Sequence, residues 1–260
     1  MTSPAIPALP TAPTLSIFFP MWNEEDLIVR TVSAGRELCE RLRLAGEIGE
    51  YEILIVDDAS TDGTGKLADE LADEDPAVRV IHHEVNRKLG GALKTGFAHA
   101  RGDLVLYTDA DLPFDMRDVE KAMRLLRIYE ADIVSPYRLD RTAEGPRRTV
   151  YSFAYNHLVR WAFGLRLRDV NFAFKLLRRR VLEHVTLESE GSFIDVELLA
   201  NAQRRGFEII QFGVDYFPRT RGVSTLSSPA VIRTMLGEMA RLAPEIRRLE
   251  PLPASVLEAR

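Results

Sequence analysis

The alternation of short apolar segments with longer amphipathic segments is the feature that most limits how this chain can fold. Segments rich in β-branched and aromatic residues predict strands at 14–19, 51–56, 78–83, 103–108 and 131–135. The intervening segments have helical periodicity, at about 24–44, 62–74, 88–101 and 115–130. Strands that alternate with helices predict parallel strands joined by right-handed crossovers. We therefore expect an open α/β sheet.

The composition fits an ordinary globular protein. The chain has 260 residues, of which 46% are hydrophobic, and the single cysteine, Cys39, excludes an internal disulfide and suits a reducing compartment. No apolar run approaches the roughly 18 to 20 residues that a membrane-spanning helix needs. Residues 1–13 repeat proline at every third position and lack the basic and apolar regions of a signal peptide. We predict a flexible, proline-rich arm there.

Polar side chains follow three of the predicted strands directly. The first strand leads into PMWNEE (20–25), the second into DDASTDGT (57–64) and the fourth into DADLP (109–113). In open α/β sheets, ligands bind at the carboxyl ends of the strands. Three polar loops at equivalent strand ends therefore predict one binding site.

Asp109 and Asp111 are the candidate metal ligands. In an extended segment, residues two apart point the same way, so both carboxylates would face one spot. Such oxygen ligands suit Mg²⁺ or Mn²⁺, which share their coordination with substrate phosphates. The alternative is a pair of solvated acids in a turn.

The ordered motifs resemble family 2 glycosyltransferases of the GT-A fold, and within them the dolichyl- or polyprenyl-phosphate mannose synthase group. The resemblance covers about residues 14–228. The motifs that carry it are PMWNEE, VDDASTDGT, NRKLGGALKTGF, DADLP, DIVSPYR, RDVNFAFKLLRR, FIDVELLANAQRRGF and RTRGVS, in the order of the family. It implies a Rossmann-like, mixed but mostly parallel sheet flanked by helices, in a single domain (14–228). An amphipathic helix and tail would follow at 229–260.

The resemblance also implies roles for individual residues. The implied contacts with the donor nucleotide are Pro20, Trp22, Glu24, Val56, Asp58, Asp109, Ala110, Asp111, Arg138 and Arg219. Asp109 and Asp111 would hold the metal, and Asp111 and Arg219 would act in catalysis. A guanidinium suits phosphate because it offers two donors in a fixed geometry. Pro20, Trp22 and Arg138 also have plain structural explanations: a strand end, packing and a surface position.

Several positions depart from the family pattern. Trp22 replaces a tyrosine, Pro113 a glutamine, the Phe172–Ala173 pair a Ser-Gly pair, and Thr225 a lysine. Lys175 and Arg221 are the candidates for the missing positive charge, and with Ser224 they would contact the acceptor phosphate. These changes bear on the sugar nucleotide: GDP-mannose is the first choice, and UDP-glucose or another UDP-sugar is the alternative.

A basic segment suggests an anionic acceptor at a membrane. Residues 138–180 hold ten Arg and one Lys against three acids, a net +8 in a chain of net −5. Within it, 145–169 mixes arginines with aromatic residues, as expected of a helix at a lipid–water interface; the alternative is a helix whose aromatics face the core. We expect a cytoplasmic enzyme, peripheral at the inner face of the membrane, with a separate membrane-anchoring protein as a possible partner.

The reaction that the resemblance implies is transfer of a hexose from a sugar nucleotide to a polyprenyl phosphate, with inversion. A phosphate acceptor is already anionic and needs little help from a general base. A sugar hydroxyl would need one. Asp195 and Glu197 are the candidates, with Asp195 preferred, and their spacing on a helix allows at most one to face the site. Capping or pairing with an arginine is the alternative for Asp195.

Two other classes are weighed against this interpretation. A sugar nucleotidyltransferase would carry a glycine-rich, lysine-bearing signature after the first strand, which is absent. A binding protein that had lost catalysis would be expected to lose Asp109 or Asp111. His82 and His83 are interpreted as loop or core histidines, and no nucleic-acid-binding pattern is found. The glycines of KLGGALKTG do not follow the P-loop order and are predicted to let a helix approach the nucleotide.

Overall fold

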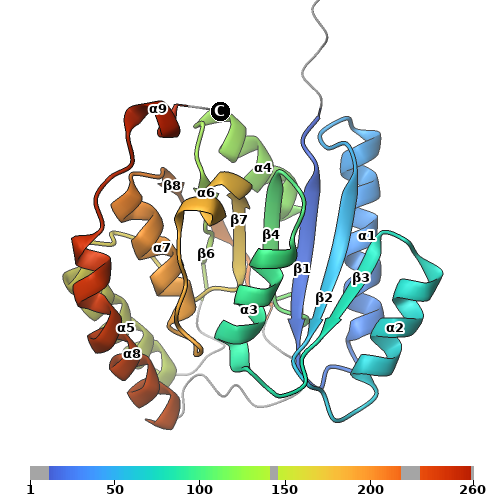
Figure 1. The fold of residues 1–260 in the computed structure, drawn as a ribbon, viewed down its shortest axis with the longest axis horizontal. Coiled ribbons are helices and arrows are strands. Elements are labelled where there is room, and N and C mark those ends of the chain that lie inside the picture. Colours follow the sequence, from blue (N-terminus) through green and yellow to red (C-terminus); the bar gives the residue numbers. More distant parts are fainter. Residues whose placement is uncertain (1–11, 141–145, 218–228, 259–260) are drawn as a thin grey trace, which may run out of the picture.

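The computed structural model describes residues 12–140, 146–217 and 229–258, and its centre is a seven-stranded mixed sheet (Figure 1). The strand order is β3-β2-β1-β4-β7-β5-β8. The strands are β1 (Leu15–Met21), β2 (Tyr51–Asp57), β3 (Val78–His82), β4 (Leu104–Thr108), β5 (Ile133–Val134), β7 (Phe174–Arg178) and β8 (Ile209–Ile210). Strand β7 is antiparallel to both of its neighbours, and the other pairs are parallel. A small parallel pair, β6 (Tyr137–Arg138) and β9 (Gly213–Val214), lies beside it.

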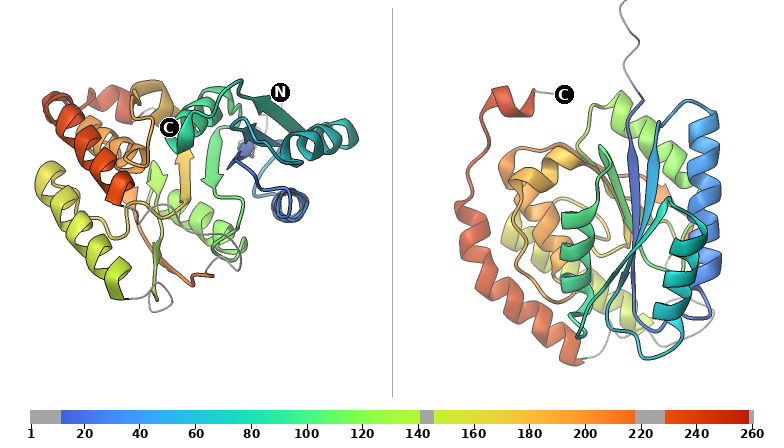
Figure 2. Two further views of the ribbon diagram at one scale, coloured as in Figure 1. Left: turned by 90° about the horizontal axis from the view of Figure 1, so that it is seen from below. Right: turned by 45° about the vertical axis from the view of Figure 1, so that its right-hand side comes forward.

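Helices cover both faces of the sheet, as the view along the strands shows (Figure 2). On one face lie α1 (Ile28–Leu44), α2 (Thr64–Glu74) and α4 (Asp118–Ile128). On the other lie α3 (Lys88–His99) and α7 (Ile194–Arg205), with α8 (Pro229–Arg248) packed on α7 and on α5 (Pro146–Phe163). Two short helices, α6 (Arg179–His184) and α9 (Ala254–Leu257), complete the described chain. The expected α/β fold, with a mostly parallel sheet between helices, is confirmed.

Alternation along the strands divides the core into two layers. In β1, Ile17 and Phe19 face α1 and α4, whereas Phe18 faces α3, and all three are fully buried. Gly96 explains how α3 comes so close, because a Cβ there would lie 2.2 Å from the Phe18 ring. Gly90 lies against the backbone of Ser189 and Glu190 in the same way. Gly90 and Gly96 therefore allow close packing within the protein, and the expected approach of this helix to the nucleotide stays a prediction.

The helical starts and the later strands differ from the sequence-based expectation. Helix α1 begins four residues later than predicted, because residues 22–27 form a polar loop held by the next loop. The segment 131–135 contributes only the two-residue strand β5. Strand β7 was not predicted, although its residues belong to a quoted motif. The proline-rich arm lies outside the described residues except for its last two positions, 12 and 13.

Candidate active site

The loops that follow β1 and β2 are tied together by hydrogen bonds. The backbone N–H of Asn23 donates to Ser60 Oγ (3.0 Å), and the N–H of Thr61 donates to Asn23 Oδ1 (2.7 Å). The N–H of Gly63 donates to Glu25 Oε2 (2.7 Å). Asn23 has a φ of 55°, a left-handed conformation that asparagine tolerates better than most residues. These two sequence-distant loops thus form one rigid surface at the carboxyl edge of the sheet, as the sequence predicted.

The acidic loop 109–112 leaves the central strand β4 at the same edge. The N–H of Leu112 donates to the carbonyl of Asp109 (3.2 Å), and Leu112 has a φ of 48°. The segment is therefore a turn, and the extended geometry expected for Asp109 and Asp111 is wrong. Both acids are nevertheless only half-buried, with Ala110 buried between them. The hydroxyl of Thr31, on α1, donates to the carbonyl of Ala110 and so fixes the turn.

Asp57 ends β2 and Asp58 directly follows it, and their side chains point to opposite faces of the sheet, each toward a histidine. His82 Nδ1 lies 2.8 Å from Asp57 Oδ2, and its Nε2 lies 3.0 Å from Oδ1 of Asp69 on α2. His83 Nδ1 lies 2.6 Å from Asp58 Oδ1. Burial lowers the pKa of His82, but the hydrogen bonds to Asp57 and Asp69 outweigh it and raise the pKa above its usual value. This pairing was not predicted, although a signal for it exists in the sequence. Asp57 and Asp58 lie at the end of one strand, and His82 and His83 lie at the end of the next.

The other implied donor contacts lie at this edge with different exposures. Trp22 is about half exposed, Pro20 is partly buried at the end of β1, and Glu24 donates its N–H to Thr64 Oγ1 (2.8 Å). Val56 is fully buried against α3, so its side chain is part of the core.

Arg138 is held in a buried ion pair. Its Nε and Nη2 each lie 2.6 Å from an oxygen of Asp169, and both side chains are less than a tenth exposed. The rings of Phe172 and Tyr216 lie 5.6 and 5.1 Å from the guanidinium carbon. The surface position considered for Arg138 is therefore wrong. Its guanidinium is fixed in direction at the margin of the acidic loop, since the Phe172 ring packs edge-on against Phe114 and β7 starts beside Thr108.

Asp195 and Lys175 meet beneath the acidic loop. Asp195 accepts a hydrogen bond from Tyr107 (2.9 Å), and its Oδ1 lies 3.4 Å from Lys175 Nζ. Burial raises the pKa of the Asp195 carboxyl and of the Tyr107 hydroxyl. Lys175 is fully buried and also donates to the carbonyl of Phe172. Two roles are therefore weighed for Lys175: a structural partner of Asp195 and a contact with the acceptor phosphate. The placement of Lys175 favours the structural role.

Glu197 points elsewhere, as its spacing from Asp195 on α7 predicted. Its two oxygens accept the N–H groups of Glu188 (2.8 Å) and Ser189 (2.9 Å). Burial raises the pKa of this carboxyl. Glu197 thus holds the 188–191 turn. Arg219, Arg221 and Ser224 lie outside the described residues.

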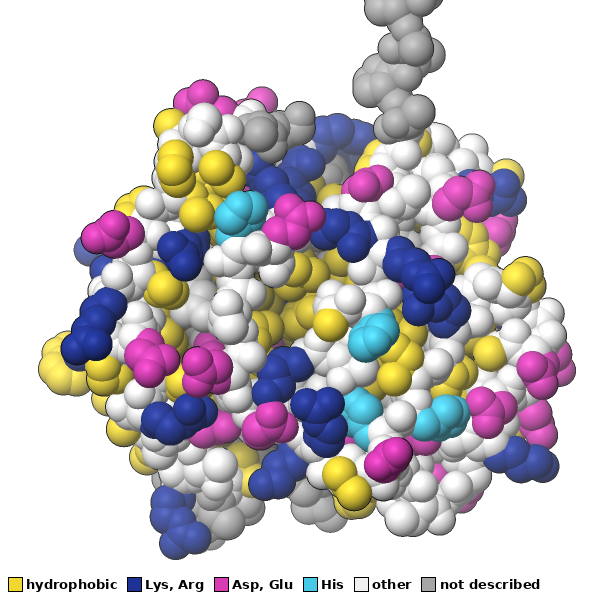
Figure 3. Space-filling view, in the orientation of Figure 1, with side chains coloured by type: hydrophobic (Ala, Val, Ile, Leu, Met, Phe, Trp, Pro, Cys, Tyr) yellow, Lys and Arg dark blue, Asp and Glu magenta, His cyan; other side chains and the backbone are white. Residues whose placement is uncertain are grey.

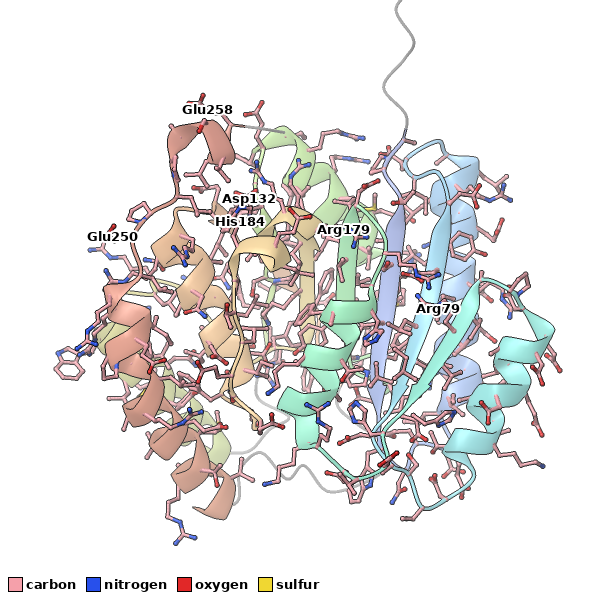
Figure 4. All side chains as sticks on the ribbon, viewed as in Figure 1. Arg79, Asp132, Arg179, His184, Glu250 and Glu258 are labelled. Carbon is pink, nitrogen blue, oxygen red and sulfur yellow. The ribbon has the colours of Figure 1, made fainter. Side chains whose placement is uncertain are left out.

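Part of the basic segment lies at the opposite end of the sheet. Arg179 donates to the carbonyls of Ala100 (2.9 Å) and Gly102 (2.7 Å), and Arg180 pairs with the buried Asp132. Arg178 donates to the carbonyl of Ala131 (3.0 Å). In Figure 4, Asp132 and Arg179 lie at the end away from the acidic loop. These three arginines stabilise the fold, so only the remainder of the segment is available to an anionic ligand.

Helix α5 divides its aromatic residues between core and surface. Phe163 is buried, whereas Phe153 is 65% and Trp161 80% exposed. Hydrophobic side chains appear at the margin of the molecule over α5 and α8 (Figure 3). Over the described ranges, no helix is both long and apolar enough to cross a bilayer.

Asp109 and Asp111 suit a divalent cation that is shared with a ligand. Their carboxylates are hard oxygen donors on a fixed turn, and within the described ranges no cluster of three His, Cys, Asp or Glu side chains forms a complete protein cage. Mg²⁺ characteristically takes one or two carboxylates and completes its coordination with water and phosphate. The donor set therefore fits Mg²⁺ or Mn²⁺ bound together with a diphosphate.

The comparison with protein families decides the class. The sequence profile described as Glycosyl transferase family 2 matches residues 16–186, well over half of the chain. The chain belongs to glycosyl transferase family 2. That match includes all three strand-end loops described above, together with β7. By family the chain is a glycosyltransferase, and two of the relatives described next carry mannose or glucose in their names.

Several curated relatives act on lipid phosphates by name. Polyprenol monophosphomannose synthase of Mycolicibacterium smegmatis is 33% identical over 239 residues, which is 87% of this chain and 85% of that protein. Human dolichyl-phosphate beta-glucosyltransferase is 28% identical over 228 residues, 81% of this chain and 70% of that protein. Glycosyltransferase AglD of Haloferax volcanii is 37% identical over 210 residues, and the chain spans only 33% of its length. The names of the first two relatives support a lipid-phosphate glycosyltransferase.

Solved structures agree on the fold. Glucosyl-3-phosphoglycerate synthase of Mycobacterium tuberculosis, in complex with Mn²⁺, UDP-glucose and phosphoglyceric acid, superposes with a TM-score of 0.63 at 21% identity, covering 88% of this chain and 80% of that one. A mannosyltransferase of Pyrobaculum calidifontis, in complex with GDP-Man and Mn²⁺, gives 0.59 at 20% identity, covering 90% and 68%. At this identity the likeness shows the GT-A fold.

Proposed function

We propose that this family 2 enzyme transfers a hexose, with mannose from GDP-mannose as the first choice, to a polyprenyl phosphate with inversion at the anomeric carbon. The observation that carries the proposal is the acidic turn Asp109–Asp111 at the end of the central strand, beside the two interlocked loops. Two relatives with mannose in their names support the sugar: the Mycolicibacterium smegmatis synthase and an undecaprenyl-phosphate mannosyltransferase of Micrococcus luteus, 32% identical over 199 residues.

The donor would lie across the three loops at the carboxyl edge. Asp58, Trp22 and Glu24 would contact the nucleoside, and Asp109 and Asp111 would hold Mg²⁺ or Mn²⁺ against the diphosphate. A divalent ion there neutralises the charge that develops on the departing diphosphate. The tied loops would keep these side chains in place before the donor binds, so that little reorganisation is needed during the reaction.

The acceptor phosphate would attack the anomeric carbon from the side opposite the diphosphate. It carries its own negative charge, so no carboxylate base is required. The burial of Asp195 against Tyr107 and Lys175 supports this route, since a base must reach the proton it removes. Arg138, with its fixed direction, and Arg219, Arg221 and Ser224 remain the proposed phosphate contacts.

The exposed aromatic residues of α5 would rest at the headgroup level of a membrane. Phe153 and Trp161 are eight positions apart on the helix, and the exposed Arg160 and His157 lie on the same side. Aromatic and cationic side chains on one face are typical of an interfacial helix. We therefore propose a peripheral enzyme at the cytoplasmic, inner face of the membrane; a separate anchoring protein remains a possible partner.

A UDP-sugar is the second candidate donor, and the glucosyl-transferring relative favours it. With a sugar-hydroxyl acceptor, Asp195 would have to leave its buried partners to act as base. The rival classes, a sugar nucleotidyltransferase and a non-catalytic nucleotide-binding protein, are disfavoured by the family membership and by the presence of both acids in the turn.

The test is a transfer assay on the purified chain. Protein is incubated with Mn²⁺ and GDP-mannose or UDP-glucose, with and without a short polyprenyl phosphate. We expect glycolipid to form only with polyprenyl phosphate, and with GDP-mannose in preference. If glycolipid formed with UDP-glucose and not with GDP-mannose, UDP-glucose would replace GDP-mannose as the proposed donor. Release of pyrophosphate from a nucleoside triphosphate and a sugar phosphate, without glycolipid, would move the protein to the nucleotidyltransferase class.

A further inference from the structure

His83 and Asp58 form a buried cross-strand pair on the α3 face of the sheet. His83 directly follows β3, and its N–H donates to the carbonyl of Asp57 (2.9 Å), which places it beside Asp58 at the end of β2. The two side chains are 7% and 5% exposed. The second ring nitrogen of His83, Nε2, lies 2.8 Å from the hydroxyl of Thr95 on α3. The imidazole is therefore held from both sides.

The remaining contacts of Asp58 fix its backbone and one of its oxygens. Its N–H donates to the carbonyl of Met21 at the end of β1 (2.8 Å), and its carbonyl accepts from Asn86 Nδ2 (3.2 Å). Oδ1 accepts two bonds, from His83 Nδ1 and from the N–H of Arg87 (2.7 Å). Among the bonds found between described residues, none uses Oδ2. The carboxylate is thus oriented, with one oxygen occupied and the other left for a donor group.

We propose that His83, supported by Thr95, is a positioning residue for donor binding, which aims Oδ2 of Asp58 at an N–H or O–H group of the donor nucleoside. This inference rests on the proposed function. The geometry requires Nδ1 of His83 to carry a proton that it donates to Asp58, so that Nε2 accepts from the Thr95 hydroxyl in the neutral ring. A carboxylate oxygen only accepts, so it suits an imide or amide N–H of a base, or a ribose hydroxyl.

Substitution of His83 separates positioning from packing. In His83→Leu the volume is largely kept, but Asp58 loses one of the two bonds to Oδ1 and can rotate. In His83→Asn the side-chain amide sits close to the position of Nδ1 and can still donate to Asp58. A charge-assisted hydrogen bond of this kind corresponds to roughly a 10- to 100-fold change in affinity. The loss should appear in nucleotide binding and donor KM, because the proposed contact of Asp58 is with the nucleoside and not with the reacting atoms.

The experiment measures GDP and UDP binding by calorimetry in the presence of MnCl₂, with donor KM and kcat for whichever sugar nucleotide the wild-type chain turns over. We expect His83→Leu to weaken binding of the preferred nucleotide and to raise KM by about tenfold or more, with kcat changed less than about threefold. His83→Asn should recover most of the affinity. Thr95→Val should weaken binding by a smaller factor and serves if His83→Leu fails to fold.

The matched control is His82→Leu. It removes the equivalent imidazole–carboxylate bond on the opposite face, to Asp57, and should leave nucleotide affinity within about twofold. Equal loss in His82→Leu and His83→Leu, or unchanged binding in His83→Leu and Thr95→Val, would overturn the inference and leave the proposed function standing. A wild-type protein that binds neither GDP nor UDP would overturn the proposed function together with this inference.

Discussion

The two ends of the central sheet are both rich in charged side chains, but they use them differently. At the amino edge, acids meet guanidinium groups: Arg180 pairs with Asp132, and Arg79 with Glu52, whose other oxygen accepts from Ser16 Oγ (2.6 Å). At the carboxyl edge, the bonds found for Asp57 and Asp58 come from backbone N–H groups and imidazoles. Acids at the amino edge are thus paired with arginines, whereas Asp57 and Asp58 at the carboxyl edge are not, which agrees with the proposed binding of a cation and a diphosphate there.

This difference follows from the topology. The parallel strands β1, β2 and β4 end together at the carboxyl edge, where each chain segment must turn into a helix. Loops there are stabilised by short side chains that bond to backbone, such as Asn23 and Asp62. At the amino edge, long arginines reach across to carbonyls and acids of neighbouring segments. The carboxyl edge is therefore rigid without being neutralised by arginine at those positions.

The sharpest way to test the contrast is to remove charge from the acidic turn. Asp109→Asn and Asp111→Asn keep the shape of the side chain but weaken the hold on a divalent ion and on the diphosphate. We expect transfer activity to fall about 10²- to 10³-fold or more in each. The melting temperature should change by no more than about 2 °C, since both side chains are only half-buried.

Turnover in the presence of Mn²⁺ and a thermal melt of the apoprotein give the two readouts. If either variant retained full activity, or if the loss of activity matched a loss of folded protein, the acidic turn would not be the cation site.

The sequence predicted the carboxyl-edge loops because their signal is local. A run of strand residues followed by Asp or Asn within a few positions identifies a strand end, and parallel topology places such ends together. The bonds that shape the site are not local. They join residues that are distant in the sequence: Asp58 to His83, Arg138 to Asp169, and Lys175 to Asp195. These pairs can be predicted only when the strand register and the antiparallel direction of β7 are known.

The roles of the arginines could not be assigned from sequence for the same reason. Charge counting treats residues 138–180 as one basic segment, but Arg138 lies near the carboxyl edge and Arg180 at the amino edge. Strand β7 carries the chain from one edge to the other between them. Net charge is additive along a sequence, whereas the field at a site depends on which edge each charge reaches.

At the amino edge, breaking one ion pair should affect stability and leave chemistry intact. Asp132→Asn removes the negative charge that faces Arg180 and weakens the bond from the N–H of Glu208, which Asp132 Oδ2 accepts (2.9 Å). We expect the free energy of unfolding to fall by about 3 kcal/mol, as for other buried pairs that lose one partner. Activity per folded molecule should be unchanged.

Urea denaturation followed by circular dichroism measures this loss. Glu70→Gln is the control: it removes an exposed pair with Lys66 on α2 and should change the free energy of unfolding by less than about 0.5 kcal/mol. Similar losses in the two variants would mean that the amino-edge pair contributes no more than a surface pair.

The third prediction concerns α5, which lies outside both edges of the sheet. It tests whether the exposed aromatic residues of this helix bind a membrane surface. In the double variant Phe153→Ser, Trp161→Ser we expect partition onto vesicles containing anionic lipid to fall about tenfold, because two aromatic side chains leave the interface. Nucleotide binding should be unaffected. Leu44→Ser, at an equally exposed position on α1, is the control and should not change partition. Sedimentation with vesicles measures all three proteins, and equal behaviour would remove α5 from the proposed membrane surface.

The smallest expected effect concerns His82 and its dependence on pH. Although burial opposes protonation, the hydrogen bonds to Asp57 and Asp69 raise the pKa of His82 above its usual value near 6.5. A raised pKa of a histidine in the folded state stabilises the protein fully below the unfolded-state pKa, and this stabilisation is lost as the pH rises through the folded-state value.

The melting temperature of the wild-type protein should therefore exceed that of His82→Gln most at pH values below about 6.5. The gap should narrow above that pH. Because the ring is partly exposed, the difference should be only one or two degrees, on the order of what a weak surface pair provides. Melting curves of both proteins between pH 5.5 and 8.5, in the absence of divalent ions, measure it. A gap that widened with pH would show that His82 is neutral in its pair with Asp57. It would contradict the raised pKa of His82 and the ion pair that this pKa implies.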